Sequence, residues 1–269
     1  MNNFVPNDEY AGLKYASVVW YCFFNDIGAL QMVDFSLVGN SNHKIHVQVA
    51  RQIARKILSE ELGQNEKRPS ELELCKLFGV SRTALRESTK LLSAKGLILS
   101  KPKVGTTVLP RNHWHFLDPQ LLEWIQDLED TKPFLSQFLG LRKAIEPEAC
   151  ALAAINASAE QRKELSVIFQ RMSMAANRHD YEDWIINDHL FHQTIFLCTR
   201  NHFYIPFSNI LSTIFKLFID ESVEGGRFCL DEHRSIYDAI MAGNQFQARL
   251  ASQTLLNDEN QKLSKVVNG

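Results

Sequence analysis

Apolar residues recur at helical spacing from about residue 43, with basic residues mostly on the opposite face, which predicts an amphipathic first helix. Gly63 is the predicted end of this helix, in the position after the C-cap that glycine favours. Ser70 is followed three residues later by Glu73, the sequence of a capping box. We therefore expect a short second helix that begins after Ser70 and ends at a tight turn at Gly79.

A third helix and a hairpin follow in the pattern. Ser81 is a suitable N-cap, and the pair Lys95-Gly96 predicts the end of this helix. Residues 97–100 and 106–109 have the composition of two short strands, joined by a basic tip at 101–105. Helix, short helix, glycine turn, helix and basic hairpin is the order of a winged helix-turn-helix.

The second half of the chain carries no strand pattern. Glycine and proline are sparse from residue 118 onward, and apolar residues recur at helical spacing. The expected helices are 118–130, 133–155, 159–177, 180–199, 203–222, 229–242 and 244–266. Helices of this length with short connections predict an antiparallel all-α bundle. The predicted fold class is therefore mostly α, a winged helix-turn-helix followed by a helical bundle.

These patterns divide the chain into four segments. Residues 1–40 form an N-terminal extension to which we assign no role, and Met32 is a possible alternative start. The predicted DNA-binding domain covers 41–110, the linker 111–119 and the helical domain 120–266. The aromatic residues of the linker predict that it packs against a neighbouring element.

Charge separates the two predicted domains. Residues 44–111 contain fourteen Lys and Arg against six Glu, a net charge of +8, so the remaining residues carry −10 of the total of −2. This asymmetry is expected when a phosphate-binding domain is joined to a ligand-binding domain, and a solvated charged surface is the alternative. The five cysteines are far apart and without a C-x-x-C pair, and no apolar stretch is long enough for a membrane span. We expect a cytoplasmic protein without a membrane partner.

The start of the predicted third helix offers residues that could contact DNA. Arg82 and Arg86 are four apart and share one helix face, from which arginine can bind guanine through two donors. Ser81 and Thr83 are suited to phosphates or a thymine methyl group. The other candidates continue this face or form the hairpin: Lys90, Lys101, Lys103 and Gly105. A solvated helix face is the alternative interpretation.

Three residues of the helical half could bind a metal ion. Asp188 and His192 are four residues apart, so a helix places the carboxylate and the imidazole on one face. His233, on a distant predicted helix, is a third possible ligand. The alternative is that these histidines are ordinary core or surface residues.

Arg142 and Glu146 also stand four apart, on an otherwise apolar helix. An arginine directed into a bundle can bind a carboxylate, although an ordinary helical ion pair explains the same spacing. We find no nucleophile beside a base and no glycine-rich phosphate loop, so the sequence predicts no enzyme. A metal-binding helical-bundle enzyme that uses Asp188, His192 and His233 is the alternative, and a scaffolding protein is a third class.

The chain resembles the DNA-binding domain of the GntR family of regulators. The matching residues lie at 69–74, 79–87, 92, 95–98 and 104–106, within a match that covers nearly all of 44–109. The family commonly has a DNA-contacting arginine where this chain has Leu72. This departure implies one lost contact and an altered operator preference.

Residues 135–260 resemble the FCD effector domain of the FadR branch of this family. The resemblance rests on residues 141–149, 188–192, Asn201 and 232–243. It implies a divalent metal, often zinc or nickel, held by one Asp and three His beside a pocket for small organic acids. Asp188, His192 and His233 match three of these ligands, and Leu255 stands at the fourth. Two interpretations stay open: three ligands completed by water or the effector, or a polar pocket without metal.

Within this branch, residues 108–124 and 142–148 are similar to repressors that respond to sugar acids. The resemblance implies an effector such as galactonate or a related aldonate, bound near Arg142, Glu146, Asp188, His192 and His233. It further implies a homodimer that binds double-stranded DNA at a palindromic operator and is released by the acid.

Overall fold

The computed structural model describes residues 19–24, 30–35, 44–64, 69–101, 105–222 and 228–267. The chain forms two compact units, Met1–His115 and Phe116–Gly269. The first unit begins with an antiparallel pair of strands, β1 (Val19–Phe24) and β2 (Leu30–Phe35). Most of the N-terminal extension considered above, residues 1–18, 25–29 and 36–40, lies outside the described residues.

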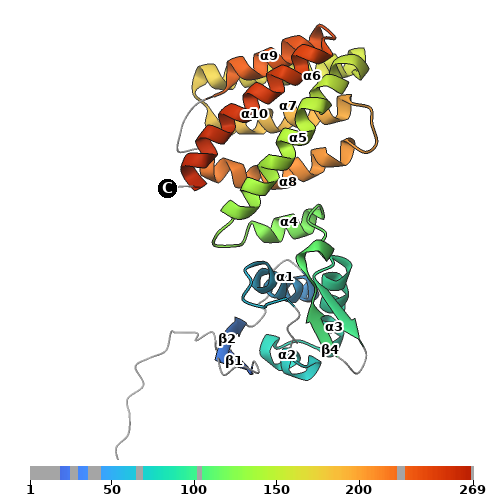
Figure 1. Cartoon of the computed structure of the whole chain (residues 1–269), viewed down its shortest axis with the longest axis vertical. Helices are drawn as coiled ribbons and strands as arrows, with labels where there is room; N and C mark the ends of the chain where they lie inside the picture. The colour runs from blue at the N-terminus through green and yellow to red at the C-terminus, as the bar shows by residue number, and fades with distance from the viewer. Residues whose placement is uncertain are drawn as a thin grey trace, which may run out of the picture. The chain divides into compact units, whose positions relative to one another are not determined.

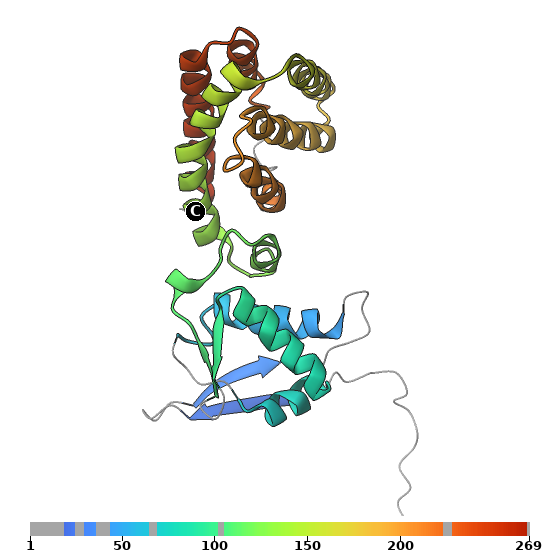
Figure 2. The same ribbon diagram turned by 90° about the vertical axis from the view of Figure 1, so that its right-hand side faces the viewer.

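The first unit then has the element order predicted for a winged helix-turn-helix. Helices α1 (Ile45–Leu58), α2 (Glu71–Phe78) and α3 (Arg82–Ala94) precede the antiparallel strands β3 (Ile98–Lys101) and β4 (Gly105–Val108) (Figures 1 and 2). Helices α1 and α3 pack on each other, and α2 packs on α3. The buried residues that join these elements include Ile53, Ile57, Phe78, Leu85, Leu92 and Ile98.

The predicted helix signals around the turn are confirmed. The Ser70 side chain accepts a hydrogen bond from the Glu73 amide, and the Glu73 side chain accepts one from the Ser70 amide, so the capping box is complete. Gly79 has φ +65°, a left-handed conformation that costs glycine little. The Ser81 hydroxyl accepts a hydrogen bond from the Ala84 amide at 3.2 Å and fixes the start of α3.

The predicted end of the first helix at Gly63 is wrong. Helix α1 ends at Leu58, and the left-handed residue after its C-cap is Glu60, with φ +64°. The Leu62 amide donates to the Lys56 carbonyl at 2.9 Å, and the Leu62 side chain is buried. Burial of Leu62 therefore turns the chain back before Gly63 is reached.

The predicted hairpin is confirmed as β3 and β4, with Ile98 opposite Val108 and Lys101 opposite Gly105. Residues 102–104 of the tip, Lys103 among them, lie outside the described residues.

After β4 the chain forms a linker turn, residues 110–115, that includes the short 3-10 helix η1 (Arg111–His113). Arg111 pairs with Glu60 at 2.7 Å and lies over the Trp114 ring. Trp114 is buried and donates from Nε1 to the Leu109 carbonyl at 2.8 Å. The His115 amide donates to the Lys95 carbonyl at the end of α3. The linker turn is thus packed on the winged-helix unit.

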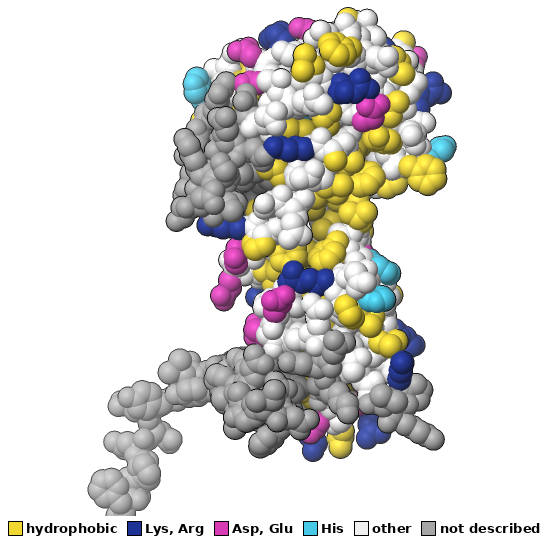
Figure 3. Space-filling view, in the orientation of Figure 1, with side chains coloured by type: hydrophobic (Ala, Val, Ile, Leu, Met, Phe, Trp, Pro, Cys, Tyr) yellow, Lys and Arg dark blue, Asp and Glu magenta, His cyan; other side chains and the backbone are white. Residues whose placement is uncertain are grey.

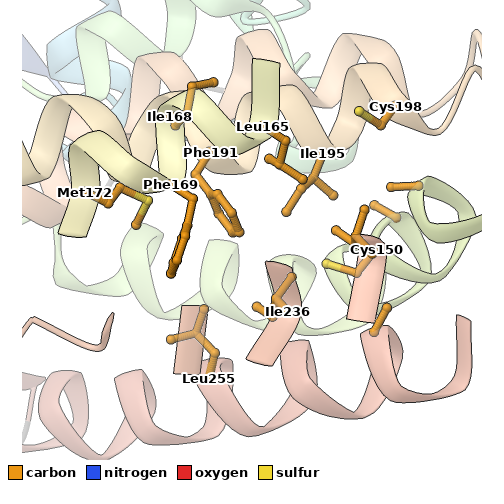
Figure 4. Close-up of a cluster of buried hydrophobic side chains, with 14 of the residues drawn as sticks. Cys150, Leu165, Ile168, Phe169, Met172, Phe191, Ile195, Cys198, Ile236 and Leu255 are labelled. Carbon is orange, nitrogen blue, oxygen red and sulfur yellow. The ribbon is translucent and has the colours of Figure 1, made fainter. Parts of the chain in front are cut away.

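The second unit is the predicted all-helical bundle. Its helices are α4 (Pro119–Ile125), α5 (Lys132–Asn156), α6 (Ala159–Arg178), α7 (Tyr181–Cys198), α8 (Ile205–Ser222), α9 (Leu230–Met241) and α10 (Gln245–Val267). Helix α5 packs along α10, α6 along α7, and α9 on α5, α6 and α10 (Figure 1). The core consists of side chains from α5, α6, α7, α8, α9 and α10, several of which are drawn in Figure 4.

One predicted helix of this unit, 118–130, is too long. Helix α4 ends at Ile125, and the chain passes through a turn to Asp130 before α5 begins. The acidic residues Asp127, Glu129 and Asp130 in this stretch favour a turn over a helix C-terminus, whose dipole disfavours negative charge. Among the helices with described residues, none is both long and apolar enough to cross a membrane.

Candidate DNA interface and effector site

Helix α3 presents a polar, exposed face that begins at its first turn. Arg82, Thr83, Arg86 and Lys90 are exposed, whereas Leu85 and its apolar neighbours face the core. Lys101 and Gly105 are exposed at the ends of the paired wing strands. The structure therefore leaves the described DNA-binding candidates on the surface, where Figure 3 shows dark-blue Lys and Arg side chains at several places.

Two basic residues of this face carry acidic partners. The Arg86 Nε atom donates to both carboxylate oxygens of Glu71, in the first turn of α2, at 3.2 Å each. Lys90 donates to Glu87 at 2.8 Å. Arg82 has no ion-pair partner among the described residues. Glu71 was not singled out by sequence reasoning, because its sequence neighbours suggested only a helix start.

Leu72 lies beside Glu71 on α2, and half of its side chain is exposed. An exposed leucine carries no charge for a phosphate and no donor for a base edge. The surface at this position is therefore apolar.

In the second unit, α5, α7 and α9 bring a buried polar cluster together. Asp188 and His192 come from α7 and His233 from α9, and all three are buried. The His233 Nε2 atom lies 2.7 Å from Asp188 Oδ1 and 3.3 Å from His192 Nε2. His192 Nε2 lies 3.9 Å from Asp188 Oδ1. The three residues predicted as metal ligands thus each place one possible ligand atom within 4.8 Å of the other two.

Neighbouring groups determine which ring nitrogens carry protons. His233 Nδ1 lies 2.6 Å from the Cys229 carbonyl oxygen, which can only accept, so Nδ1 is the donor. His192 Nδ1 lies 3.2 Å from a carboxylate oxygen of Glu146 and donates in the same way. In the neutral rings both Nε2 atoms are therefore lone-pair acceptors.

In neutral rings of this kind the converging atoms are three acceptors, whereas a proton on His233 Nε2 would donate to Asp188 across the 2.7 Å contact. Asp188 Oδ1 also accepts no hydrogen bond of good geometry within the described residues, although His233 Nε2 is close. Such an arrangement is repulsive unless a cation or an additional proton lies between the atoms.

A divalent cation fits this donor set. Bonds of about 2.05 Å at tetrahedral angles would place donor atoms about 3.3 Å apart. The observed separations of 2.7, 3.3 and 3.9 Å lie on both sides of that value. The carbonyl and carboxylate that hold the two Nδ1 protons are the outer partners that metal-binding histidines usually have.

Glu146 links this cluster to Arg142. Arg142 donates from Nε and from a terminal nitrogen to the two carboxylate oxygens of Glu146, and both side chains are buried. Burial raises the pKa of Glu146, but the positive charge of Arg142 and the hydrogen bonds from His192 and Arg142 outweigh this effect and lower that pKa to about 2. Arg142 is therefore paired with a carboxylate of its own helix. Its role in binding an external acid stays a prediction.

Aromatic side chains surround the two histidines. The Trp184 ring meets His233 edge-on at 5.6 Å, and Phe191 contacts both His192 and His233. His233 is further fixed by its own amide, which donates to the Cys229 carbonyl at 3.1 Å. Sequence reasoning missed the Cys229 carbonyl and the Glu146–His192 contact, because backbone acceptors and contacts between helices have no local signature.

Leu255, at the position of the fourth expected ligand, is fully buried. Its side chain points from α10 into the hydrophobic cluster, among residues that include Ile236 (Figure 4). Among the described residues, three side chains could therefore act as ligands at this site, not four.

Comparison with known proteins agrees with both units. Residues 45–108 match the model of bacterial regulatory proteins of the gntR family, and residues 137–258 match that of the FCD domain. An uncharacterized HTH-type transcriptional regulator of Escherichia coli, YieP, is 35% identical over 208 residues, which are 77% of this chain and 90% of that protein. The chain belongs to the GntR family and carries an FCD domain.

Other similar proteins are more distant from this GntR regulator. The galactonate operon transcriptional repressor of E. coli is 27% identical over 74% of this chain and 87% of the repressor. The solved structure of Lar, which controls the expression of the Listeria monocytogenes agr system, has a TM-score of 0.57 at 20% identity and covers 84% of this chain and 99% of its own. This last similarity supports the fold alone. The protein is thus a DNA-binding transcriptional regulator.

Proposed function

We propose that this regulator is a homodimeric repressor released from a palindromic operator by a small sugar acid. The observation that carries the effector part is the buried set of converging acceptors from Asp188, His192 and His233. The proposed DNA-binding domain covers 41–110, the linker 111–119 and the effector and dimerisation domain 120–266. The alternative of a metal-binding enzyme has no support, because the relatives are transcriptional regulators.

On DNA, we assign base contacts to Arg82 and Arg86, because both are exposed on the first two turns of α3. We assign phosphate contacts to Ser81 and Thr83, because the DNA backbone runs close to the start of a recognition helix. The remaining proposed contacts are to the backbone or the minor groove, from Lys90 and from the wing residues Lys101, Lys103 and Gly105.

Replacement of Arg82 tests this assignment. R82A should weaken operator binding by about 1–3 kcal/mol and relax base preference at one position. R171A, which removes an exposed arginine from α6, is the matched control and should leave operator binding unchanged. Equal operator affinity for wild type and R82A in a titration by fluorescence anisotropy would remove Arg82 from the base contacts.

At the effector site, we propose that Asp188, His192 and His233 hold a divalent cation, zinc or nickel. When bound, the cation supplies a Lewis-acidic centre with open positions for oxygen ligands. The charges of Arg142, Glu146 and Asp188 sum to −1 with both histidines neutral, and a divalent cation changes the sum to +1. An anionic acid is therefore attracted only to the metal-loaded site.

We propose a sugar acid as the effector, with its carboxylate near the metal and the Arg142–Glu146 pair and its hydroxyl groups on the surrounding polar atoms. The support for this class is the galactonate repressor among the relatives. The positive charge of Arg142 is close enough to act on the site through Glu146, which contacts His192.

Thermal unfolding with zinc, nickel, D-galactonate and a chelator tests both assignments, since a ligand of the folded state raises its stability. Metal should raise the midpoint of the wild type, and galactonate should raise it further only when metal is present. H192A should lose both effects, whereas H202A, which removes an exposed histidine, should keep them. A galactonate effect that survives chelation would support the polar pocket without metal.

A further inference from the structure

The exposed face of α3 contains an arginine whose orientation is set by another helix. Glu71 belongs to the first turn of α2, and Arg86 is the fifth residue of α3. The Arg86 Nε–H group is shared between the two Glu71 carboxylate oxygens, both at 3.2 Å. Within the described part of the chain, the terminal Nη groups of Arg86 make no hydrogen bond.

This contact uses one edge of the guanidinium group and leaves another available. A guanidinium has five N–H donors in a fixed plane, and guanine requires two of them, side by side, for O6 and N7. When Nε is held by a carboxylate, the two Nη groups are the remaining pair of donors. An arginine held in this way loses less conformational entropy when it binds a base.

The location of Glu71 needs an explanation, because a carboxylate beside a DNA-binding helix repels phosphates. Its backbone position is fixed by the capping box of Ser70 and Glu73 on either side. Glu71 itself takes no part in that capping box, and both Glu71 and Arg86 are exposed, with 41% and 66% of their side chains open to solvent. The surface thus retains a negative charge that the helix start does not require.

We propose that Glu71 is a positioning residue, which holds Arg86 in the orientation that binds a base. The proposal rests on the proposed role of Arg86 in base contact. The negative charge of Glu71 lowers the affinity of the protein for DNA of any sequence. By holding Arg86, Glu71 increases the discrimination between bases. The apolar neighbour Leu72 adds no competing donor for the same carboxylate.

A second acidic residue of the same surface serves as a matched control. Glu87 is exposed on α3 and pairs with Lys90, a candidate for phosphate contact. Replacing either glutamate by glutamine removes one negative charge with little change in size. Only the Glu71 replacement releases the arginine.

The experiment compares two DNA duplexes by fluorescence anisotropy: the sequence that the wild-type protein selects from a random library, and a scrambled duplex of equal composition. For E71Q we expect affinity for the selected duplex to fall about tenfold, the range of one lost arginine–base contact. Affinity for the scrambled duplex should rise, because a negative charge is removed. E87Q should raise or maintain affinity for both. E71A, which removes the carboxylate in another way, should behave as E71Q.

The R86A background separates this proposal from the one on which it rests. If Arg86 contacts a base and Glu71 orients it, R86A weakens binding to the selected duplex, and adding E71Q causes no further loss. If R86A binds the selected duplex like wild type, the proposed role of Arg86 is wrong. If R86A weakens binding but E71Q strengthens binding to both duplexes, Arg86 acts without Glu71 and the positioning role is excluded.

Discussion

The buried polar residues of the bundle depend on one another for their charge states. Arg142 keeps Glu146 ionised, Glu146 accepts from His192, and the Cys229 carbonyl accepts from His233. Because each outer acceptor binds the Nδ1 proton of one histidine, the Nε2 atom of that neutral ring is left as an acceptor. The acceptor atoms at the centre therefore depend on the residues around the two rings. The loss of one outer residue should therefore affect folding as well as ligand binding.

Arg142 provides the clearest test at this scale. R142A leaves the Glu146 carboxylate buried without its main counter-charge, which should lower the free energy of unfolding by about 3–5 kcal/mol. Arg249 pairs with Glu148 of the same helix α5 at 2.7 Å but is partly exposed, so R249A should cost less than about 1 kcal/mol. Urea denaturation checks both values. Equal losses in the free energy of unfolding for the two variants would show that burial of Arg142 does not increase its contribution to stability.

Much of this site follows from the sequence. The spacing of Asp188 and His192 predicted their shared helix face, the residues themselves made His233 a third candidate, and resemblance to the FCD domain implied that the three act together. The contact of Glu146 with His192 joins α5 to α7 and depends on how the two helices pack, which no local pattern encodes. The same holds for Arg86 and Glu71, fifteen residues apart on α3 and α2.

At the scale of elements, the linker turn is built on the end of α3. Gly96 has φ +71°, and a Cβ atom there would lie 1.9 Å from the His113 carbonyl oxygen. The absence of a side chain thus allows the linker turn to lie against the helix end, where His115 donates to Lys95. The next residue in the chain, Phe116, contacts Phe134 of α5, the helix that carries Arg142 and Glu146.

Replacing Gly96 should separate the linker turn from α3. G96A combines a left-handed backbone with a clash against main-chain atoms, so we expect a loss of more than about 2 kcal/mol. G140A is the control: Gly140 lies inside α5 with open space around it, and alanine should stabilise by about 0.5–1 kcal/mol. Thermal unfolding of both variants measures the difference. An unchanged midpoint for G96A would mean that the linker turn does not pack there in solution.

Sequence patterns located these elements better than their ends. Caps with a side-chain signature, at Ser70 and Ser81, were predicted correctly because each depends on residues within one turn. The ends of α1 and α4 were wrong, since burial of Leu62 and the turn after Ile125 decide them.

For the whole molecule, the charge difference of +8 against −10 agrees with a unit that binds DNA and a unit that does not. A two-fold homodimer would present two α3 helices to one face of DNA. We expect a mass in solution of twice 30.8 kDa by light scattering. The selected operator should contain two half-sites about 10 bp apart or at a multiple of that spacing. A monomer that protects a single half-site would contradict this symmetry.

We infer that the buried cluster of α5, α7 and α9 controls DNA binding. The most direct test measures the operator dissociation constant with zinc present, with and without D-galactonate, for wild type and for D188N. Galactonate should raise the dissociation constant of the wild type about 5- to 150-fold, the usual range of coupling between two sites, and should leave that of D188N nearly unchanged. Equal release of both proteins, or of neither, would contradict it.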